Sequence, residues 1–252
     1  MSSNIDFDIQ KYLKKAALIW SEANPSSAKH ELVDPDMAED KCRLLHSRLI
    51  EITKHYSNYQ KVEDFKNTHY TYCVPEISDD GVCSYPDKLE PEPYNLEGVL
   101  GKISVANLRL LNTLNDLVEI AYTDLSTDWL GIYRRFQISE TPTLVKLAYR
   151  GIPSRAEFPI TESFAEKSNN SAVALNGSSV IINNLEVHLN KGGVFYVCDE
   201  AVKSEACLPI FSTDFSRVLG VVDAEDTKTY AYKSKQLSYL VALCLVLSAV
   251  LT

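Results

Sequence analysis

The feature that most constrains the fold is a change of hydrophobic pattern near Asp128. Before this residue, apolar side chains recur at helical spacing, and after it they form short runs rich in Val, Ile and aromatic residues, separated by turn residues. Five runs are expected to be strands: residues 129–134, 143–149, 179–183, 205–211 and 217–223. Because few helical segments separate these runs, they predict an antiparallel sheet and an α+β domain over residues 107–252.

The other regular segments are expected to be helices. Apolar residues recur at helical spacing over residues 6–22, 37–52, 96–125 and 163–175, and Asp36 is the expected cap of the second helix. Residues 67–95 are rich in Pro, Asp, Gly and Tyr, which predicts a long irregular loop. We therefore expect a helical extension over residues 1–106, which carries the loop at 67–95, followed by the domain over residues 107–252.

The charge balance and the cysteine content exclude several classes of protein. The chain has 25 Lys and Arg against 34 Asp and Glu, a net charge of −9, whereas binding to nucleic acid or acidic lipid needs clustered cations. Nucleic acid and membranes are therefore not expected as partners. The first residues lack the basic and apolar regions of a secretory signal, and six cysteines in 252 residues do not make a disulfide scaffold. We expect a cytoplasmic protein with reduced thiols.

Two further features argue against a membrane anchor and a metal site. Residues 237–251 are almost entirely apolar, but a run of about 15 residues is shorter than the 20 or so that a membrane span needs. A buried terminal helix is expected instead, and a homodimer would bury its second apolar face. Cys73 and Cys83 are separated by nine residues, and no second close pair of Cys or His completes a zinc site.

Two neighbouring runs carry the candidate chemistry. Strand alternation places Glu205 on one face of its strand, and it places Asp223 and Glu225 on one face of the next strand, together with Val221 and Leu219. A short turn joins these strands, so we expect them to pair and to gather three carboxylates on a concave surface. Clustered carboxylates raise one another's pKa, so one can stay protonated and donate a proton while ionised neighbours bind an ammonium group.

Two cysteines lie beside these carboxylates in the sequence. Cys198 precedes the first strand and is a candidate nucleophile. Carboxylates alone disfavour its thiolate, so a substrate or a local donor must assist. Cys207 shares a strand face with Glu205, and we expect it to pack in the core, since an isolated cysteine usually behaves as a small hydrophobe. Carboxylates at strand ends are usually solvated or cap turns, so the functional interpretation rests on the joint pattern.

Three motifs follow one another in an informative order. A Trp-x-Gly-x-Tyr strand occupies residues 129–133, and a Cys-Asp pair at 198–199 is followed by Ser-Glu, with the Glu seven positions after the Cys. A Gly-Val-Val-Asp-Ala-Glu run occupies residues 220–225. Over residues 105–252 the chain thereby resembles GAF domains and, among them, the free methionine-(R)-sulfoxide reductases. The resemblance implies a GAF-like (PAS/profilin-like) antiparallel sheet flanked by helices, here with an N-terminal helical extension.

The resemblance implies a reaction and its catalytic residues. Cys198 would attack the sulfur of free methionine-(R)-sulfoxide. Glu205 and Asp223 would bind the substrate ammonium group and help to protonate the departing oxygen. The substrate would be a free, amino-acid-like small molecule.

The same resemblance implies further substrate-binding residues. Asp199 and Glu225 would add to the acidic part of the site. Trp129 and Tyr133 would form the wall around the methyl-thioether end of the substrate, although buried aromatic side chains serve core packing equally well.

The implied redox cycle needs no bound cofactor. The reaction would leave a sulfenic acid on Cys198, a second thiol would form a disulfide with it, and a thioredoxin-like reductant would reset the enzyme. The family usually carries further cysteines before the central strand, but residues 162–180 contain none, and residues 170–172 stand where one is expected. The candidate resolving thiols are therefore Cys207, Cys73 and Cys83.

Two other functions stay open. A non-catalytic GAF sensory or regulatory module would bind a small ligand in the same pocket and use its helices for dimerisation, since a fold does not determine a function. An interaction protein would instead bind a partner through its N-terminal helices and acidic face.

Overall fold

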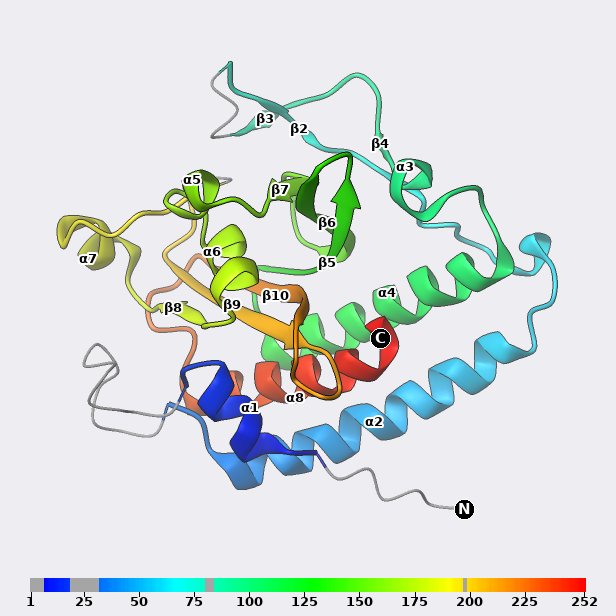
Figure 1. Cartoon of the computed structure of the whole chain (residues 1–252), viewed down its shortest axis with the longest axis horizontal. Coiled ribbons are helices and arrows are strands. Elements are labelled where there is room, and N and C mark those ends of the chain that lie inside the picture. The colour runs from blue at the N-terminus through cyan, green and yellow to red at the C-terminus, as the bar shows by residue number, and fades with distance from the viewer. Residues whose placement is uncertain (1–6, 19–31, 80–83, 197–198) are drawn as a thin grey trace.

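The computed structural model describes residues 7–18, 32–79, 84–196 and 199–252, and within them an antiparallel sheet of six strands forms the centre of the molecule (Figure 1). The strands lie in the order β7-β6-β5-β10-β9-β8, and all neighbours are antiparallel. Their bounds are β5 Trp129–Ile138, β6 Thr141–Arg150, β7 Glu157–Pro159, β8 Val180–Ile182, β9 Ser204–Phe211 and β10 Val218–Asp226. The expectation of an α+β fold with an antiparallel sheet flanked by helices is confirmed.

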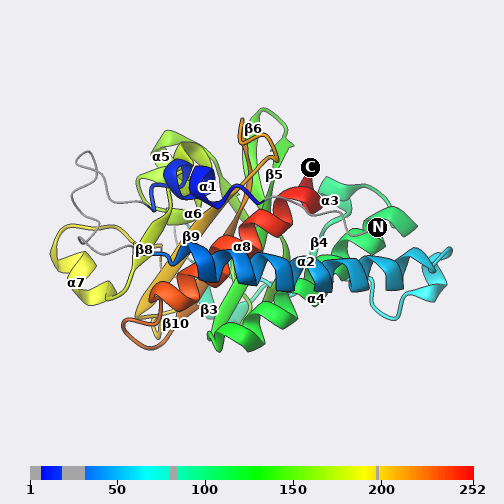
Figure 2. The same cartoon turned by 90° about the horizontal axis from the view of Figure 1, so that it is seen from below.

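Helices cover both faces of this sheet. On one face lie α4 (Val105–Leu125) and α8 (Ser234–Leu251), and α2 (Pro35–Ser57) packs over both of them as an outer layer (Figure 2). The short helix α1 (Ile9–Lys15) packs beside α2 and α8. The opposite face carries α5 (Glu162–Ala165) and α6 (Asn169–Asn176), and the remaining short helices are η1 Val62–Asp64, α3 Glu97–Leu100 and α7 Leu185–Asn190.

The terminal helix α8 lies at the centre of the larger hydrophobic core. It contacts β9 and β10 on one side and α2 on the other. Within the described residues, α8 alone is long and apolar enough to cross a membrane by length and composition, and 72% of it is buried inside the structure. Because the sheet and α2 cover opposite sides of α8, an almost continuous apolar sequence is expected for a core helix.

The helix boundaries follow from local capping groups. Helix α2 begins at Pro35 rather than after Asp36, because the Asp34 carboxylate accepts a hydrogen bond from the amide of Met37 (3.1 Å). The helix expected over residues 96–125 is broken at Gly101, whose φ of 74° ends α3, and Ser104 then caps α4. The helix expected over residues 163–175 also divides in two, because Ser168 begins a new helix, α6.

The segment expected to be an irregular loop, residues 67–95, contains short strands in its described part. They are β1 Thr71–Tyr72, β2 Pro75–Ile77, β3 Ser84–Leu89 and β4 Tyr94–Asn95, and β1 pairs with β4 while β2 pairs with β3. Two tyrosines attach this segment to the central sheet. The hydroxyl of Tyr72 donates to the carbonyl of Lys146 (2.7 Å), and the hydroxyl of Tyr94 donates to the carboxylate of Glu157.

An irregularity in β10 changes one expected side-chain direction. The pairing of β10 with β9 shifts between Val218 and Gly220, so Leu219 packs in the helix-side core and not on the face of Val221. Strict alternation along β10 was therefore wrong at Leu219. The close approach of the neighbouring strand requires glycine here, because a Cβ atom on Gly220 would lie 2.0 Å from the carbonyl oxygen of Tyr133.

Candidate functional site

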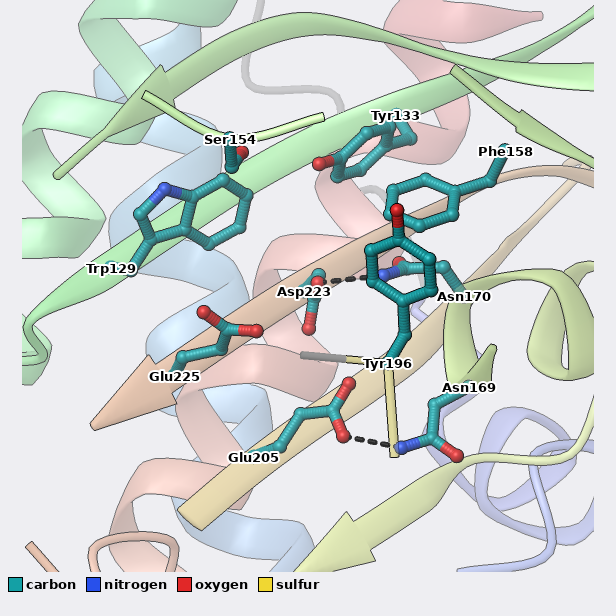
Figure 3. A pocket seen from close by; sticks show the side chains of 10 residues that line it. All are labelled: Trp129, Tyr133, Ser154, Phe158, Asn169, Asn170, Tyr196, Glu205, Asp223 and Glu225. Carbon is teal, nitrogen blue, oxygen red and sulfur yellow. Dashed lines mark hydrogen bonds between the residues drawn. The ribbon is translucent and has the colours of Figure 1, made fainter. Parts of the chain in front are cut away.

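A cavity lies between the sheet and α6 (Figure 3). Its walls combine acidic, amide and aromatic side chains from β5, β7, β9, β10, α6 and the intervening loops. The lining residues are Trp129, Tyr133, Ser154, Phe158, Asn169, Asn170, Tyr196, Glu205, Asp223 and Glu225. The space that the centre of a water molecule can occupy is about 10 Å³, enough for about one water molecule. A ligand as large as an amino acid therefore needs some of these side chains to move apart.

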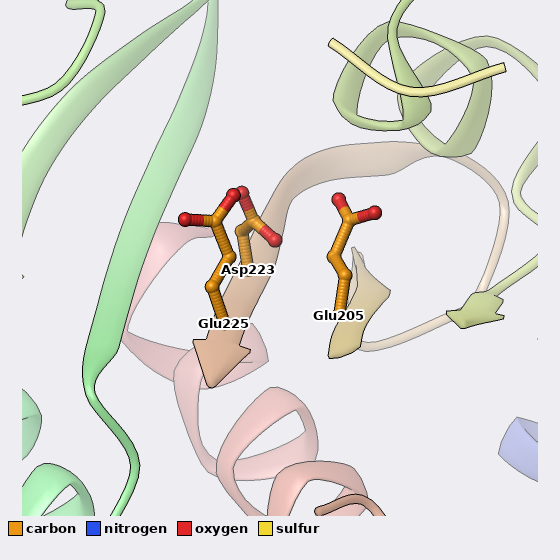
Figure 4. A group of neighbouring side chains, drawn as sticks. All are labelled: Glu205, Asp223 and Glu225. Atoms are coloured by element: carbon orange, nitrogen blue, oxygen red, sulfur yellow. The ribbon is translucent and has the colours of Figure 1, made fainter. Parts of the chain in front are cut away.

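Three carboxylates converge in this cavity from two paired strands (Figure 4). Glu205 on β9 stands opposite Glu225 on β10, and Asp223 lies two residues earlier on β10, on the same face. One oxygen of each carboxylate lies within 4.8 Å of the others. The exposed fractions are 3% for Glu205, 2% for Asp223 and 9% for Glu225, so water solvates these charges poorly.

Burial and mutual repulsion shift the protonation of this cluster. Burial, followed by the charges of Asp223 and Glu225, raises the pKa of Glu205 well above its ordinary value. Burial, followed by the charge of Asp223, likewise raises the pKa of Glu225. For Asp223, burial raises the pKa to about 6 against the hydrogen bond from Asn170, which lowers it. Near neutral pH the cluster therefore retains at least one proton unless a cation enters the cavity.

The first turn of α6 supplies amide donors to the cluster. The side-chain amide of Asn169 donates to Glu205 (2.5 Å), and that of Asn170 donates to Asp223 (2.8 Å). The second oxygen of Asp223, Oδ1, is buried and has no hydrogen-bond partner among the described residues. An unpartnered acceptor of this kind is costly when buried, so it marks the place where a ligand donor would be most stabilising.

Trp129 and Tyr133 lie on the β5 side of the cavity, and the Trp-x-Gly motif explains how the indole fits. A Cβ atom on Gly131 would lie 2.2 Å from the Trp129 ring, and one on Gly151 would lie 2.5 Å from it. The indole NH donates to the carbonyl of Ile152 (3.0 Å). Both glycines thus leave room for the indole to lie across the strand with its orientation held by a hydrogen bond.

Aromatic side chains close the other end of the cavity. The ring of Tyr196 packs against Phe158 and Phe164 with centroid distances of 5.4 and 6.2 Å. Its hydroxyl accepts a hydrogen bond from Arg155 (2.8 Å), and the Arg155 guanidinium lies over the same group of rings. Tyr196 immediately precedes residues 197–198, which lie outside the described part of the chain.

A fully buried lysine, Lys146, lies next to Trp129. Lys146 is 0% exposed, and its ammonium donates to both oxygens of Ser154, the carbonyl at 2.7 Å and the hydroxyl at 2.8 Å. The ammonium also lies 4.1 Å from the ring centre of Tyr149 and 5.8 Å from that of Trp129. Its positive charge lowers the pKa of Glu225, opposing part of the effect of burial.

The structure brings together five of the candidate residues and separates others. Trp129, Tyr133, Glu205, Asp223 and Glu225 line the cavity. Asp199 does not line it: its carboxylate accepts from the amide of Ala201 (2.9 Å) in a local turn, although its charge raises the pKa of Glu225.

The candidate thiols are dispersed among different environments. Cys207 is buried in the core layer between the sheet and α6, as expected, and its thiol donates to the side-chain amide oxygen of Asn170 (3.5 Å). Burial, followed by the charge of Asp223, raises the pKa of this thiol. Cys73 is exposed. Cys198 and Cys83 lie outside the described residues.

Sequence reasoning assigned no function to six residues of this site: the lining residues Ser154, Phe158, Asn169, Asn170 and Tyr196, and the neighbouring Lys146. Asn169, Asn170, Lys146 and Tyr196 have positions that depend on contacts distant in sequence. A weak signal existed for two of them, because Ser168 followed by paired asparagines is typical of a helix start, where side chains project from the first turn. A lysine within the otherwise apolar run of β6 was a second signal.

The side chains of the cavity are suited to binding a cation and to donating a proton. Three buried carboxylates with aromatic neighbours can hold an ammonium group, and their oxygens are also close enough to share a divalent cation. A carboxyl group kept protonated by its surroundings can donate a proton to a developing oxyanion. The aromatic side provides a complementary apolar surface.

Among known proteins, the chain is similar to several that have solved structures. No protein-family model and no curated protein matches the chain. Free methionine-R-sulfoxide reductase from Neisseria meningitidis, solved with its substrate, is 19% identical with a TM-score of 0.47, and the alignment covers 56% of this chain and 77% of that one. A type II free methionine-R-sulfoxide reductase from Thermoplasma acidophilum is 16% identical with a TM-score of 0.46, covering 56% and 94%.

A GAF sensor protein from Burkholderia vietnamiensis gives a similar result, with 22% identity, a TM-score of 0.44, and coverage of 54% of this chain and 78% of that one. Because these TM-scores are below 0.5, the function proposed below rests on the residues of the cavity. The chain is similar to solved GAF domains and free methionine-R-sulfoxide reductases.

Proposed function

We propose that this protein binds free methionine-(R)-sulfoxide in the acidic cavity and reduces it to methionine. The observation that supports the proposal is the convergence of Glu205, Asp223 and Glu225 in a buried cavity walled by Trp129 and Tyr133. A thiol at Cys198, seven residues before Glu205 in the sequence, would be the reductant.

The cavity would select a free amino acid over a methionine inside a peptide. The ammonium group of a free amino acid can neutralise the buried carboxylates, and its NH donors can reach the unpartnered oxygen of Asp223. An amide-linked methionine lacks that charge and would leave the carboxylates uncompensated. The apolar methyl-thioether end would lie against Trp129 and Tyr133.

The proposed chemistry balances in two steps. In the first, the Cys198 sulfur attacks the sulfoxide sulfur, a protonated carboxyl group of the cluster donates a proton to the oxygen, and the oxygen ends on the cysteine. The products are methionine and a sulfenic acid, so the sulfoxide gains the two electrons that the thiol loses. In the second, another thiol condenses with the sulfenic acid, which releases water and forms a disulfide that a thioredoxin-like dithiol reduces.

Turnover with separate sulfoxide diastereomers tests this function. The whole chain, incubated with free methionine-(R)-sulfoxide and dithiothreitol, is expected to form methionine, with little product from the S form or from a peptide substrate. Cys198→Ser is expected to abolish product formation and to leave substrate binding intact. Cys73→Ser, which removes an exposed thiol, should retain activity with dithiothreitol, because an external dithiol replaces the resolving cysteine.

Three other outcomes would contradict the proposed function or change it. Binding of the sulfoxide without turnover would favour a ligand-binding module over an enzyme, and absence of both binding and turnover would overturn the proposal. Loss of turnover after dialysis against EDTA, restored by a divalent cation, would show that the three carboxylates hold a metal ion rather than the substrate ammonium group.

A further inference from the structure

A second, positively charged concavity lies at the other end of β9 and β10 from the carboxylates. We call it the basic groove and define it by the cations Lys11, Lys14 and Lys15 on α1, Arg135 on β5 and Arg217 before β10. Its volume is about 750 Å³, within the range of small-molecule sites. Phe211 in the groove is six positions along the extended strand from Glu205, a distance of about 20 Å, so the two sites do not overlap.

We propose that the basic groove binds a small anion that carries two or more phosphate groups. The first support is the concentration of charge. The protein as a whole has a net charge of −9, yet five cations gather here, and none of them forms an ion pair with any carboxylate of the described residues. Like charges that lack ion-pair partners repel one another, and an anionic ligand would relieve that repulsion.

The carboxylate of Asp214 lies in the same region and is already engaged. It accepts hydrogen bonds from the hydroxyl of Ser212 (2.6 Å) and from the hydroxyl and amide of Ser216 (2.8 and 3.0 Å). The contact between Lys11 and Asp214 is to the backbone carbonyl oxygen, at 3.5 Å. Asp214 keeps its negative charge near Lys11, but among the described residues its carboxylate forms no ion pair with any of the five cations.

Two of the lysines also pack against buried aromatic rings, which limits their movement. The ammonium of Lys11 lies 4.7 Å from the ring centre of Phe215, and that of Lys15 lies 5.9 Å from the ring centre of Phe211. Both rings are buried, at 8% and 5% exposed. Helix α1 is itself tied to the sheet, because the hydroxyl of Tyr12 donates to the carbonyl of Pro209 (2.8 Å).

Helix electrostatics explains only part of this arrangement. Lys14 and Lys15 occupy the last turn of α1, where positive charge favours the helix dipole. Arg135 on β5 and Arg217 in the turn before β10 lie outside that helix and gain nothing from its dipole. Arg134 extends the same charge into an adjoining hollow of about 410 Å³, where Arg135 and Arg217 also lie. Arg134 and Arg135 on β5 and Arg217 in the turn before β10 thus line one hollow, an arrangement that suits an anionic ligand and that helix stability does not explain.

The chemistry of the cations selects phosphate groups. Guanidinium groups bind phosphate oxygens through paired N–H donors, and lysines add point charges. Several cations within one groove match a diphosphate or triphosphate better than a single phosphate. A long nucleic acid fits less well, because the remainder of the surface is acidic and would repel a polyanion that extends beyond the groove.

Calorimetric titration of the full chain tests the proposal with inorganic phosphate, pyrophosphate and triphosphate. Affinity is expected to rise with the number of phosphate groups and to fall as salt is added. Arg135→Gln and Arg217→Gln are each expected to weaken triphosphate binding by about tenfold, or about 1.4 kcal/mol, because each removes charge-assisted hydrogen bonds to the ligand. Lys66→Gln, which removes an exposed cation outside the groove, is the matched control and should bind as the wild type.

Circular dichroism establishes that each variant is folded. Equal affinity for phosphate and triphosphate would overturn the proposal, as would arginine variants that bind triphosphate as tightly as the control. Tighter binding of a single-stranded oligonucleotide than of triphosphate would assign the groove to nucleic acid instead. None of these measurements uses methionine sulfoxide, so the result is independent of the acidic cavity.

Discussion

At the level of single residues, burial of the Asp223 carboxyl group in the cavity reduces the stability of the fold as pH rises. Its pKa is raised to about 6 by burial, against an ordinary value of 3.8. Below both values the carboxyl is protonated in the folded and unfolded states alike. As pH rises between them, the unfolded state loses this proton before the folded state does, so the unfolding free energy falls.

The variant Asp223→Asn removes this ionisation with little change of shape. Relative to the wild type, the variant is expected to gain stability as pH rises from about 4 to about 6, by an amount on the order of 2–3 kcal/mol at most. Urea unfolding at a series of pH values measures the difference. The exposed Asp40→Asn is the control for loss of one negative charge, and an unchanged difference across this pH range would contradict the prediction. The same variant should lose sulfoxide binding if the proposed function is right.

At the scale of elements, α6 connects the two sites of the molecule. Its first turn carries Asn169 and Asn170, which donate to the carboxylates, while residues 174–177 at its other end line the basic groove. The packing of this helix against β9 and β10 therefore positions the amide groups that hydrogen-bond to the carboxylates of the acidic cavity.

Removal of one donor from α6 should alter binding and its pH dependence. In Asn169→Ala, Glu205 loses a hydrogen bond that lowers its pKa, so the carboxyl is expected to retain its proton to higher pH. Affinity for the sulfoxide should fall by about tenfold, the effect of removing a hydrogen bond to a charged group, and the binding profile should shift to higher pH. Asn176→Ala, at the other end of α6 and outside the cavity, should change neither property. A fall in affinity without a pH shift would show that Asn169 acts only through packing.

Elements with long periodic patterns could be predicted from the sequence, and short ones could not. The strand expected over residues 205–211 is observed as β9, at Ser204–Phe211, because residues 206–211 form an apolar run that is long enough to recognise. Strand β7 and helix α7 escaped prediction, since Glu157–Pro159 and Leu185–Asn190 are too short to display a period. The register shift at Leu219 depends on contact with another strand, which local alternation does not encode.

In the site, too, the sequence predicted the local arrangement and missed the contacts between distant segments. Glu205, Asp223 and Glu225 were expected to lie together because alternation and one short turn suffice to place them on paired strands. The amides of Asn169 and Asn170 reach those carboxylates from 36 and 53 positions away. Lys146 is buried among aromatic rings that come from three separate strands, and no local pattern describes such a contact.

At the scale of the whole molecule, the N-terminal helices share a core with the sheet. Buried residues of α1, α2, α4, α8 and the sheet form one hydrophobic cluster. The sulfur of Cys42 on α2 lies 4.0 Å from the carbonyl oxygen of Ala242 on α8, and the Ser238 hydroxyl bonds to the backbone of Asp34 (3.0 Å). Helix α2 is thus a structural layer over α8 and contributes to the stability of the sheet that bears both sites.

A larger side chain at this junction should destabilise the protein without altering the acidic cavity. Cys42 is fully buried, so Cys42→Phe is expected to lower the unfolding free energy by about 1–3 kcal/mol through overpacking. Leu44→Phe, on the exposed side of the same helix, should have little effect. Chemical denaturation measures both variants, and equal stability of the two would show that α2 does not pack tightly on α8.

The central place of α8 has a consequence for how the protein is made. This helix is the last of the described elements to be translated, yet it contacts α2, about 200 positions earlier. Until residues 234–251 emerge from the ribosome, α2, α4 and one face of the sheet expose apolar surface that has no partner. The nascent chain should therefore depend on chaperones until α8 emerges, and ribosomes stalled before residue 234 should carry chains that aggregate readily on release.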